Sequence, residues 1–187
     1  MKGDKVGGFY LFNKYGELVA RFCHRRLLET PGGISALCES YYHKKALMNG
    51  LILLKHLRWK GVAMAEFIIR TDGTPMLLEV NPRFWGSLPL AILAGVDFPR
   101  LLVETWDIRD NKPLARYKYV KCLMLTQVLD MLYTRGNIQQ KVKIIKMVLN
   151  SLSSNTYVFE LLEGDIAPFM LWVFKVISKT LNSKDRL

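Results

Sequence analysis

The sequence has few cysteines and few histidines, and neither residue type is spaced as a metal site. The three cysteines are Cys23, Cys38 and Cys122. They lie far apart in the sequence, form no Cys-x-x-Cys pair and are odd in number. This usage is typical of reduced thiols in the cytosol. The three histidines have no cysteine or histidine at ligand spacing, which favours structural or surface roles: His24, His43 and His56.

Long apolar runs are also lacking. The first residues do not contain the apolar stretch of a signal peptide. The longest late run, residues 166–173, is too short to cross a bilayer and is interrupted soon afterwards by Lys175. We therefore expect a cytoplasmic protein with no membrane partner.

Acidic residues are scarce relative to basic ones, with 16 Asp and Glu against 27 Lys and Arg, a net charge of +11. Such a balance favours a polyanionic partner, such as nucleic acid, an acidic membrane or a phosphorylated ligand, and is equally typical of a solvated basic surface. A basic nucleic-acid-binding domain is one alternative function. However, the basic residues are scattered and no nucleic-acid motif is present, which disfavours it.

The 187 residues, half of them apolar, suffice for one globular domain, although two small subdomains remain possible. Residues 8–13 and 18–25 read as a strand hairpin around Lys14-Tyr15-Gly16. The stretch "ETPGGISALCES" reads as a loop, after which Ser40 is expected to cap a helix that ends near Trp59. Strands are then expected at 61–70, 76–80 and 117–125, and helices at 88–94, 99–106, 138–152 and 168–181.

The strongest local signal is the hairpin around Thr71-Asp72-Gly73-Thr74, because Asp-Gly tolerates the positive φ angles of a tight turn. A two-residue loop pairs Thr71 with Thr74 and Ile68 with Leu77, and it places Glu66 directly opposite Glu79. Facing like charges are unfavourable unless a positive charge lies between them.

A divalent cation supplies that charge. Asn81 lies on the same face as Glu79 by strand alternation, and Arg83 follows if the chain stays extended. Carboxylate and amide oxygens suit Mg²⁺ or Mn²⁺. The alternative is that both glutamates are ordinary solvated residues, although their face-mates Met64, Ile68 and Leu77 are apolar.

The segment "GVAMAEFIIRTDGTPMLLEVNPRFWGSLPLAILAGVDFP" resembles the metal-binding end of the ATP-grasp superfamily, and is most similar to carboxylate–amine ligases like the large subunit of carbamoyl phosphate synthase. An acidic residue on one strand followed, after a turn, by Glu-x-Asn-Pro-Arg carries the resemblance. The preceding "LFNKYGELVARFCHRRLLETPGGISALCES" and the late "LEGDIAPFMLWVFKVISKTL" are also similar to that family. The implied fold class is α+β: an ATP-grasp C-terminal subdomain, with an antiparallel sheet and packed helices, followed by a mostly helical tail.

The resemblance also implies roles for individual residues. Glu66, Glu79 and Asn81 correspond to the metal ligands, and Arg83 corresponds to the catalytic arginine that faces phosphate or acylphosphate. Five more residues are implied to contact phosphate or substrate: Arg25, Arg26, Gly33, Ser35 and Ser87. For the two adjacent arginines, an exposed strand end is the alternative.

The function implied is the ATP- and Mg²⁺- (or Mn²⁺-) binding part of a ligase that joins a small carboxylate to an amine-type acceptor through an acylphosphate. Residues 1–110 are expected to form the second half of the ATP-grasp module, and residues 111–187 an extension that packs on it. The first half is expected in a longer parent chain. A remnant that has lost catalysis is the alternative.

Overall fold

The computed structural model describes residues 3–110, 112–114, 116–134, 137–152 and 155–160, with the single positions 167, 170, 171 and 174. Contacts divide the chain into two compact units, Met1–Cys122 and Leu123–Leu187. The sequence-based division at residue 110 stays a prediction about domains. The helix expected at residues 168–181 falls almost wholly outside the described residues.

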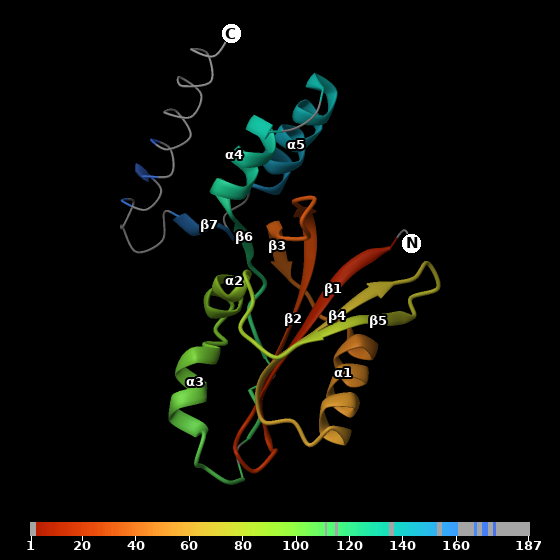
Figure 1. Cartoon of the computed structure of the whole chain (residues 1–187), viewed down its shortest axis with the longest axis vertical. Coiled ribbons are helices and arrows are strands. Elements are labelled where there is room, and N and C mark those ends of the chain that lie inside the picture. Colours follow the sequence, from red (N-terminus) through yellow and green to blue (C-terminus); the bar gives the residue numbers. More distant parts are fainter. Residues whose placement is uncertain are drawn as a thin grey trace, which may run out of the picture. The chain divides into compact units, whose positions relative to one another are not determined.

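The first unit is built on a sheet in which the strands follow the order β5-β4-β1-β2-β3-β6 (Figure 1). β1 pairs antiparallel with β2 and β4, β2 with β3, and β4 with β5. The strands are β1 (Asp4–Phe12), β2 (Leu18–Glu29), β3 (Ser35–Ser40), β4 (Gly61–Ile69), β5 (Pro75–Asn81) and β6 (Lys121–Leu123). The predicted α+β class and the hairpin of the first two strands are confirmed, although both strands are longer than expected.

One predicted loop is a strand. Residues 35–40 form β3, which pairs with β2 and is buried throughout. Ser40 cannot cap the next helix because its hydroxyl is buried and donates to the carbonyl of Lys118, 2.8 Å away. Instead His43 caps α1 (Lys44–His56), and its Nδ1 accepts a hydrogen bond from the amide of Ala46 at 3.1 Å. The expected cap at Ser40 is therefore wrong, because pairing in the sheet competes with local capping.

Adjacent residues of β1 anchor different helices, because strand alternation points them to opposite faces of the sheet. The hydroxyl of buried Tyr10 donates to the carbonyl of Leu47 in α1 at 2.9 Å. Phe9 instead packs on Trp85, whose ring contacts Phe98 at the start of α3 (Phe98–Thr105). Thus α1 covers one face, and the other face carries Trp85, α3 and the short α2 (Leu88–Leu93) (Figure 1).

The second unit contains α4 (Leu125–Thr134), α5 (Ile138–Ser151) and β7 (Thr156–Val158). The strand expected over residues 117–125 is wrong in length, because only Lys121–Leu123 is in β6 and α4 begins at Leu125. The carboxylate of Glu160 accepts from the amides of Leu125 and Thr126 at 2.8 and 2.7 Å, which satisfies free donors at the start of α4. Within the described residues, no helix has the length and apolar character needed to cross a membrane.

Candidate metal and phosphate site

The β4–β5 hairpin places Glu66 and Glu79 opposite each other, as expected, but through a different turn. The amide of Arg70 donates to the carbonyl of Thr74 at 3.0 Å, so the loop has three residues and Gly73 takes the positive φ of +78°. Leu77 consequently pairs with Phe67, and the expected pairs of Thr71 with Thr74 and Ile68 with Leu77 are wrong.

A β-bulge restores the predicted alignment. Leu78 is an extra residue in β5 between the Phe67–Leu77 pair and the Glu66–Glu79 pair. One extra residue shifts every later side chain to the other face, which compensates for the odd-numbered loop. Asn81 therefore lies on the same face as Glu79, and its amide nitrogen donates to Glu79 Oε1 at 2.7 Å.

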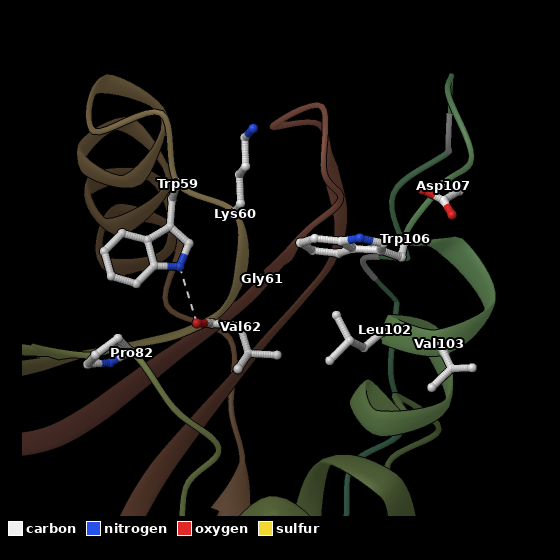
Figure 2. Close-up of a pocket in the computed structure, with 9 residues that line it drawn as sticks. All are labelled: Trp59, Lys60, Gly61, Val62, Pro82, Leu102, Val103, Trp106 and Asp107. Atoms are coloured by element: carbon white, nitrogen blue, oxygen red, sulfur yellow. Dashed lines mark hydrogen bonds between the residues drawn. The ribbon is translucent and has the colours of Figure 1, made fainter.

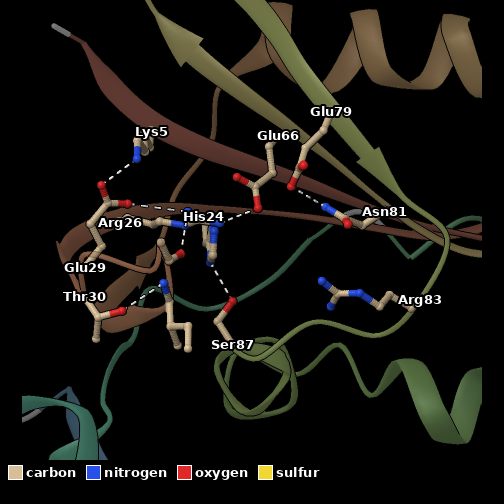
Figure 3. Close-up of polar contacts among 12 residues, drawn as sticks. Lys5, His24, Arg26, Glu29, Thr30, Glu66, Glu79, Asn81, Arg83 and Ser87 are labelled. Carbon is tan, nitrogen blue, oxygen red and sulfur yellow. Dashed lines mark hydrogen bonds and ion pairs between the residues drawn. The ribbon is translucent and has the colours of Figure 1, made fainter. Parts of the chain in front are cut away.

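Most of the predicted site residues line one cavity of about 470 Å³, which we call the site cavity. Seven of them contribute to its wall: Arg26, Gly33, Ser35, Glu66, Glu79, Arg83 and Ser87. They come from β2, the following loop, β3, β4, β5 and the loop before α2, and Figure 3 shows how several of them converge. The cavity lies on the sheet face opposite α1, since Glu66 is in register with Gly7, which has the same alternation as Phe9.

The two carboxylates differ in environment. Glu66 is half-buried and forms an ion pair with Arg26, whereas Glu79 is exposed. Burial raises the pKa of Glu66 and the neighbouring Glu79 raises it further, while Arg26 opposes both effects. Arg26 also donates to the carbonyl of Gly33 at 3.0 Å, which fixes its guanidinium at the cavity wall.

Lys5 is a cavity residue that the sequence analysis missed. Its amine contacts Glu29 at 2.5 Å, and Glu29 also lies 3.5 Å from Arg26 (Figure 3). With Arg83, three cations line the cavity against two carboxylates, Glu66 and Glu79, while Glu29 pairs with Lys5 and Arg26 without lining it. Within the described part of the chain, Arg83 has no ion pair, and its guanidinium donates only to the carbonyl of Phe84 at 3.1 Å.

Contacts with His24 and Phe9, on β2 and β1, hold the loop from Arg83 to Ser87 in place. Ser87 is buried, and its hydroxyl lies 3.0 Å from Nδ1 of His24. Trp85 is also buried, with its ring centroid 4.0 Å from that of Phe9. His24 was expected to have a structural or surface role; it is fully buried beneath this loop, and burial with the nearby charge of Arg26 lowers its pKa to about 3. It is therefore a neutral hydrogen-bond partner at physiological pH.

Arg25 is not brought to the site cavity. Strand alternation points it to the other face from Arg26, where it contacts Glu39 at 2.5 Å and Asp4 at 3.3 Å. Its guanidinium also lies 4.8 Å from the ring centroid of Tyr41. Its predicted contact with phosphate thus has no support in the geometry.

Three oxygen-bearing side chains could hold a metal: Glu66, Glu79 and Asn81. Two carboxylates and an amide fit a hard divalent cation such as Mg²⁺, which usually completes its shell with water and phosphate oxygens. Among the described residues, no group of three or more His, Cys, Asp or Glu is placed to hold a metal ion. The cations around the cavity complement an anionic ligand in the same place.

Comparison with known proteins supports this interpretation of the fold. Residues 43–128 match the model of a family described as ATP-grasp in the biosynthetic pathway with Ter operon. The match includes β4, β5 and the Glu-x-Asn-Pro-Arg run. The predicted resemblance to ATP-grasp proteins is confirmed at this level, whereas similarity to the carbamoyl phosphate synthase type stays a prediction. No curated protein is similar enough to match the chain.

One solved structure shows the same fold at low sequence identity. The biotin carboxylase domain of Hydrogenobacter thermophilus 2-oxoglutarate carboxylase, in complex with MgADP, ADP and bicarbonate, matches with a TM-score of 0.52 and 14% identity, covering 63% of this chain and 28% of that one. The Campylobacter jejuni biotin carboxylase complex with a βγ-ATP ligand gives 0.45 and 12%, covering 52% and 24%. The chain therefore spans roughly a quarter of the length of these structures, and the first match shows that it has the ATP-grasp fold.

Proposed function

We propose that this chain is the ATP- and Mg²⁺-binding part of an ATP-dependent carboxylate–amine ligase. The observation that carries the proposal is the pairing of Glu66 with Glu79, with Asn81 on the same face and Arg83 lining the same cavity. A divalent cation and a phosphate group together satisfy both the facing carboxylates and the unpaired guanidinium. Mn²⁺ can replace Mg²⁺ at such oxygen ligands.

The proposed reaction has two steps. A small carboxylate attacks the γ-phosphorus of ATP, which forms an acylphosphate and releases ADP. An amine-type acceptor then attacks the acyl carbon, so that a C–N bond replaces the acyl C–O bond, and inorganic phosphate leaves together with one proton from the nitrogen. The metal, when bound, neutralises charge on the phosphate oxygens.

The residues of the site cavity have separate tasks in this proposal. Glu66, Glu79 and Asn81 hold the metal, and Arg83 stabilises the negative charge shared between phosphate and carboxylate. Arg26 and Lys5 add further positive charge to the lining of the cavity. The hydroxyl of Ser35 can donate to a ligand oxygen, and that of Ser87 can do so when Nδ1 of His24 carries the proton and donates to Ser87. At Gly33 the cavity is open, because a Cβ there would contact nothing within 4 Å.

Isothermal titration tests the proposal. Mn²⁺ titrated into the chain in the presence of a non-hydrolysable ATP analogue should bind to wild type, and Glu79→Gln should weaken binding by roughly tenfold or more, the range typical for a lost partner at a metal site. Glu104→Gln is the matched control, because Glu104 lies on α3 outside the cavity. Equal affinities for the wild type and Glu79→Gln would contradict the proposed metal site.

A further inference from the structure

A second cavity lies in the first unit, between the start of β4 and the end of α3. Its volume is about 660 Å³, within the range of small-molecule pockets. We call it the tryptophan groove and define it by Trp59, Lys60, Val62, Pro82, Leu102 and Trp106 (Figure 2). None of its lining residues lines the site cavity.

The walls of the tryptophan groove are aromatic and apolar. The indoles of Trp59 and Trp106 come from opposite sides in Figure 2. The indole nitrogen of Trp59 already donates to the carbonyl of Val62 at 3.2 Å, so this ring offers its apolar surface rather than a hydrogen bond. Trp106 is 37% exposed and the adjoining Val103 is 83% exposed, which leaves apolar surface in contact with water. A planar apolar ligand that covers this surface gains free energy on binding.

The charged residues at the groove favour a negatively charged ligand. Asp107 forms an ion pair with Lys14 and is therefore already neutralised. Lys60 is exposed and, within the described ranges of the chain, has no ion-pair partner. Figure 2 shows its side chain at the rim between the two indoles. The groove thus combines two aromatic surfaces with one uncompensated positive charge.

We propose that the tryptophan groove binds a small planar aromatic acid, with its ring against the indoles and its carboxylate at Lys60. Charge complementarity favours an anion over a neutral or cationic ring, because the amine of Lys60 forms no ion pair with any described residue. The site is separate from the one in the site cavity and does not depend on the function proposed for that cavity.

A charge series of one ring tests the proposal. Calorimetry of the whole chain compares three indole compounds, each titrated separately. They are the anion indole-3-acetate, its neutral isostere indole-3-acetamide and the cation tryptamine. Indole-3-acetate should bind roughly two- to fivefold more tightly than the acetamide, the range of an exposed ion pair, and tryptamine should bind most weakly. Lys60→Gln should abolish the difference between acetate and acetamide, whereas Lys55→Gln, on the exposed side of α1, should retain it.

The aromatic contribution is tested by two further variants. Trp106→Ala should weaken all three compounds by about threefold or more, consistent with the loss of a ring–ring contact. Val103→Ser, at a position that is 83% exposed, should also weaken all three compounds, and it supplies the same test if Trp106→Ala is poorly folded. Absence of binding by all three compounds at millimolar concentration, or a preference for acetate that survives Lys60→Gln, would overturn the proposal.

Discussion

Glu66 contacts Arg26 in the structure and is also a carboxylate that we propose binds metal. Burial disfavours the charged form of Glu66 and raises its pKa, whereas Arg26 favours the charged form. When no cation is bound, this ion pair therefore balances the charge of the half-buried carboxylate. A metal that binds Glu66 must share its oxygens with Arg26. Phosphate oxygens beside the metal offer Arg26 an alternative partner, which is consistent with joint binding of metal and nucleotide.

His24 makes stability depend on pH. Its pKa is about 3 in the folded chain, whereas an unperturbed histidine titrates near 6.5. Between these values the unfolded chain binds a proton that the folded chain does not, so the free energy of unfolding decreases as pH falls. From pH 7 to pH 5, urea unfolding should show a slope that approaches about 1.4 kcal/mol per pH unit.

Two variants test whether His24 causes this pH dependence of the unfolding free energy. His24→Gln cannot titrate and should flatten the pH dependence between 7 and 5, while His56→Gln, at an exposed position, should keep the wild-type slope. An unchanged slope in His24→Gln would show that another group is responsible.

Residues near the site differ in how far local sequence predicts them. Glu79, Asn81 and Arg83 stand at alternate positions of one strand and its continuation, so spacing alone groups them. Lys5 and His24 join them only because β1 pairs with both β4 and β2. That pairing connects Gly7 to Glu66 across 59 positions, and no local pattern contains such a contact.

The hairpin of β4 and β5 shows how two errors in a predicted register can cancel. Sequence reasoning assumed a two-residue loop and no bulge, whereas the structure has a three-residue loop and an extra residue at Leu78. The pair Glu66–Glu79 is the same in both cases. Turn signals locate a hairpin, but the position of a bulge depends on packing against the rest of the sheet.

Deletion of Leu78 should therefore preserve the site. Without it, Leu77 still pairs with Phe67 and Glu79 with Glu66, and little burial is lost because Leu78 is 46% exposed. We expect an affinity for Mn²⁺ and the ATP analogue within about threefold of wild type, the usual scatter of context effects on one contact.

Deletion of Val80 is the matched comparison. It leaves Glu79 opposite Glu66 but moves Asn81 to the other face of the strand, because side chains alternate. The affinity for Mn²⁺ should then fall by roughly tenfold or more. Similar affinities for the two deletion variants would mean that Asn81 is not a ligand.

At the scale of the whole molecule, the chain spans 28% of the biotin carboxylase domain whose fold it shares. The residues that line the site cavity come from one sheet and the loops at its edge. Stabilisation of a transferring phosphate requires donors placed around it in advance. In the proposed function, binding of metal and nucleotide is therefore separable from turnover of ATP.

We expect the chain by itself to bind the metal–nucleotide complex without enzyme-like turnover. Phosphate release from ATP, measured with a panel of amino acids and small carboxylates, should stay at the background of an Arg83→Ala variant. Substrate-dependent release that disappears in Arg83→Ala would instead show that the chain is a complete small ligase.

Pro82 stands between two cavities. Pro82 lines the tryptophan groove, and the next residue, Arg83, lines the site cavity. The preceding residue, Asn81, donates a hydrogen bond to Glu79. Proline fixes its own φ and restricts the residue before it, so Asn81 and Pro82 form a stiff pair directly before Arg83. If an aromatic acid in the groove changes the affinity for metal and nucleotide by some factor, thermodynamic linkage requires them to change its affinity by the same factor. The binding constant of each ligand then has meaning only at a stated concentration of the other.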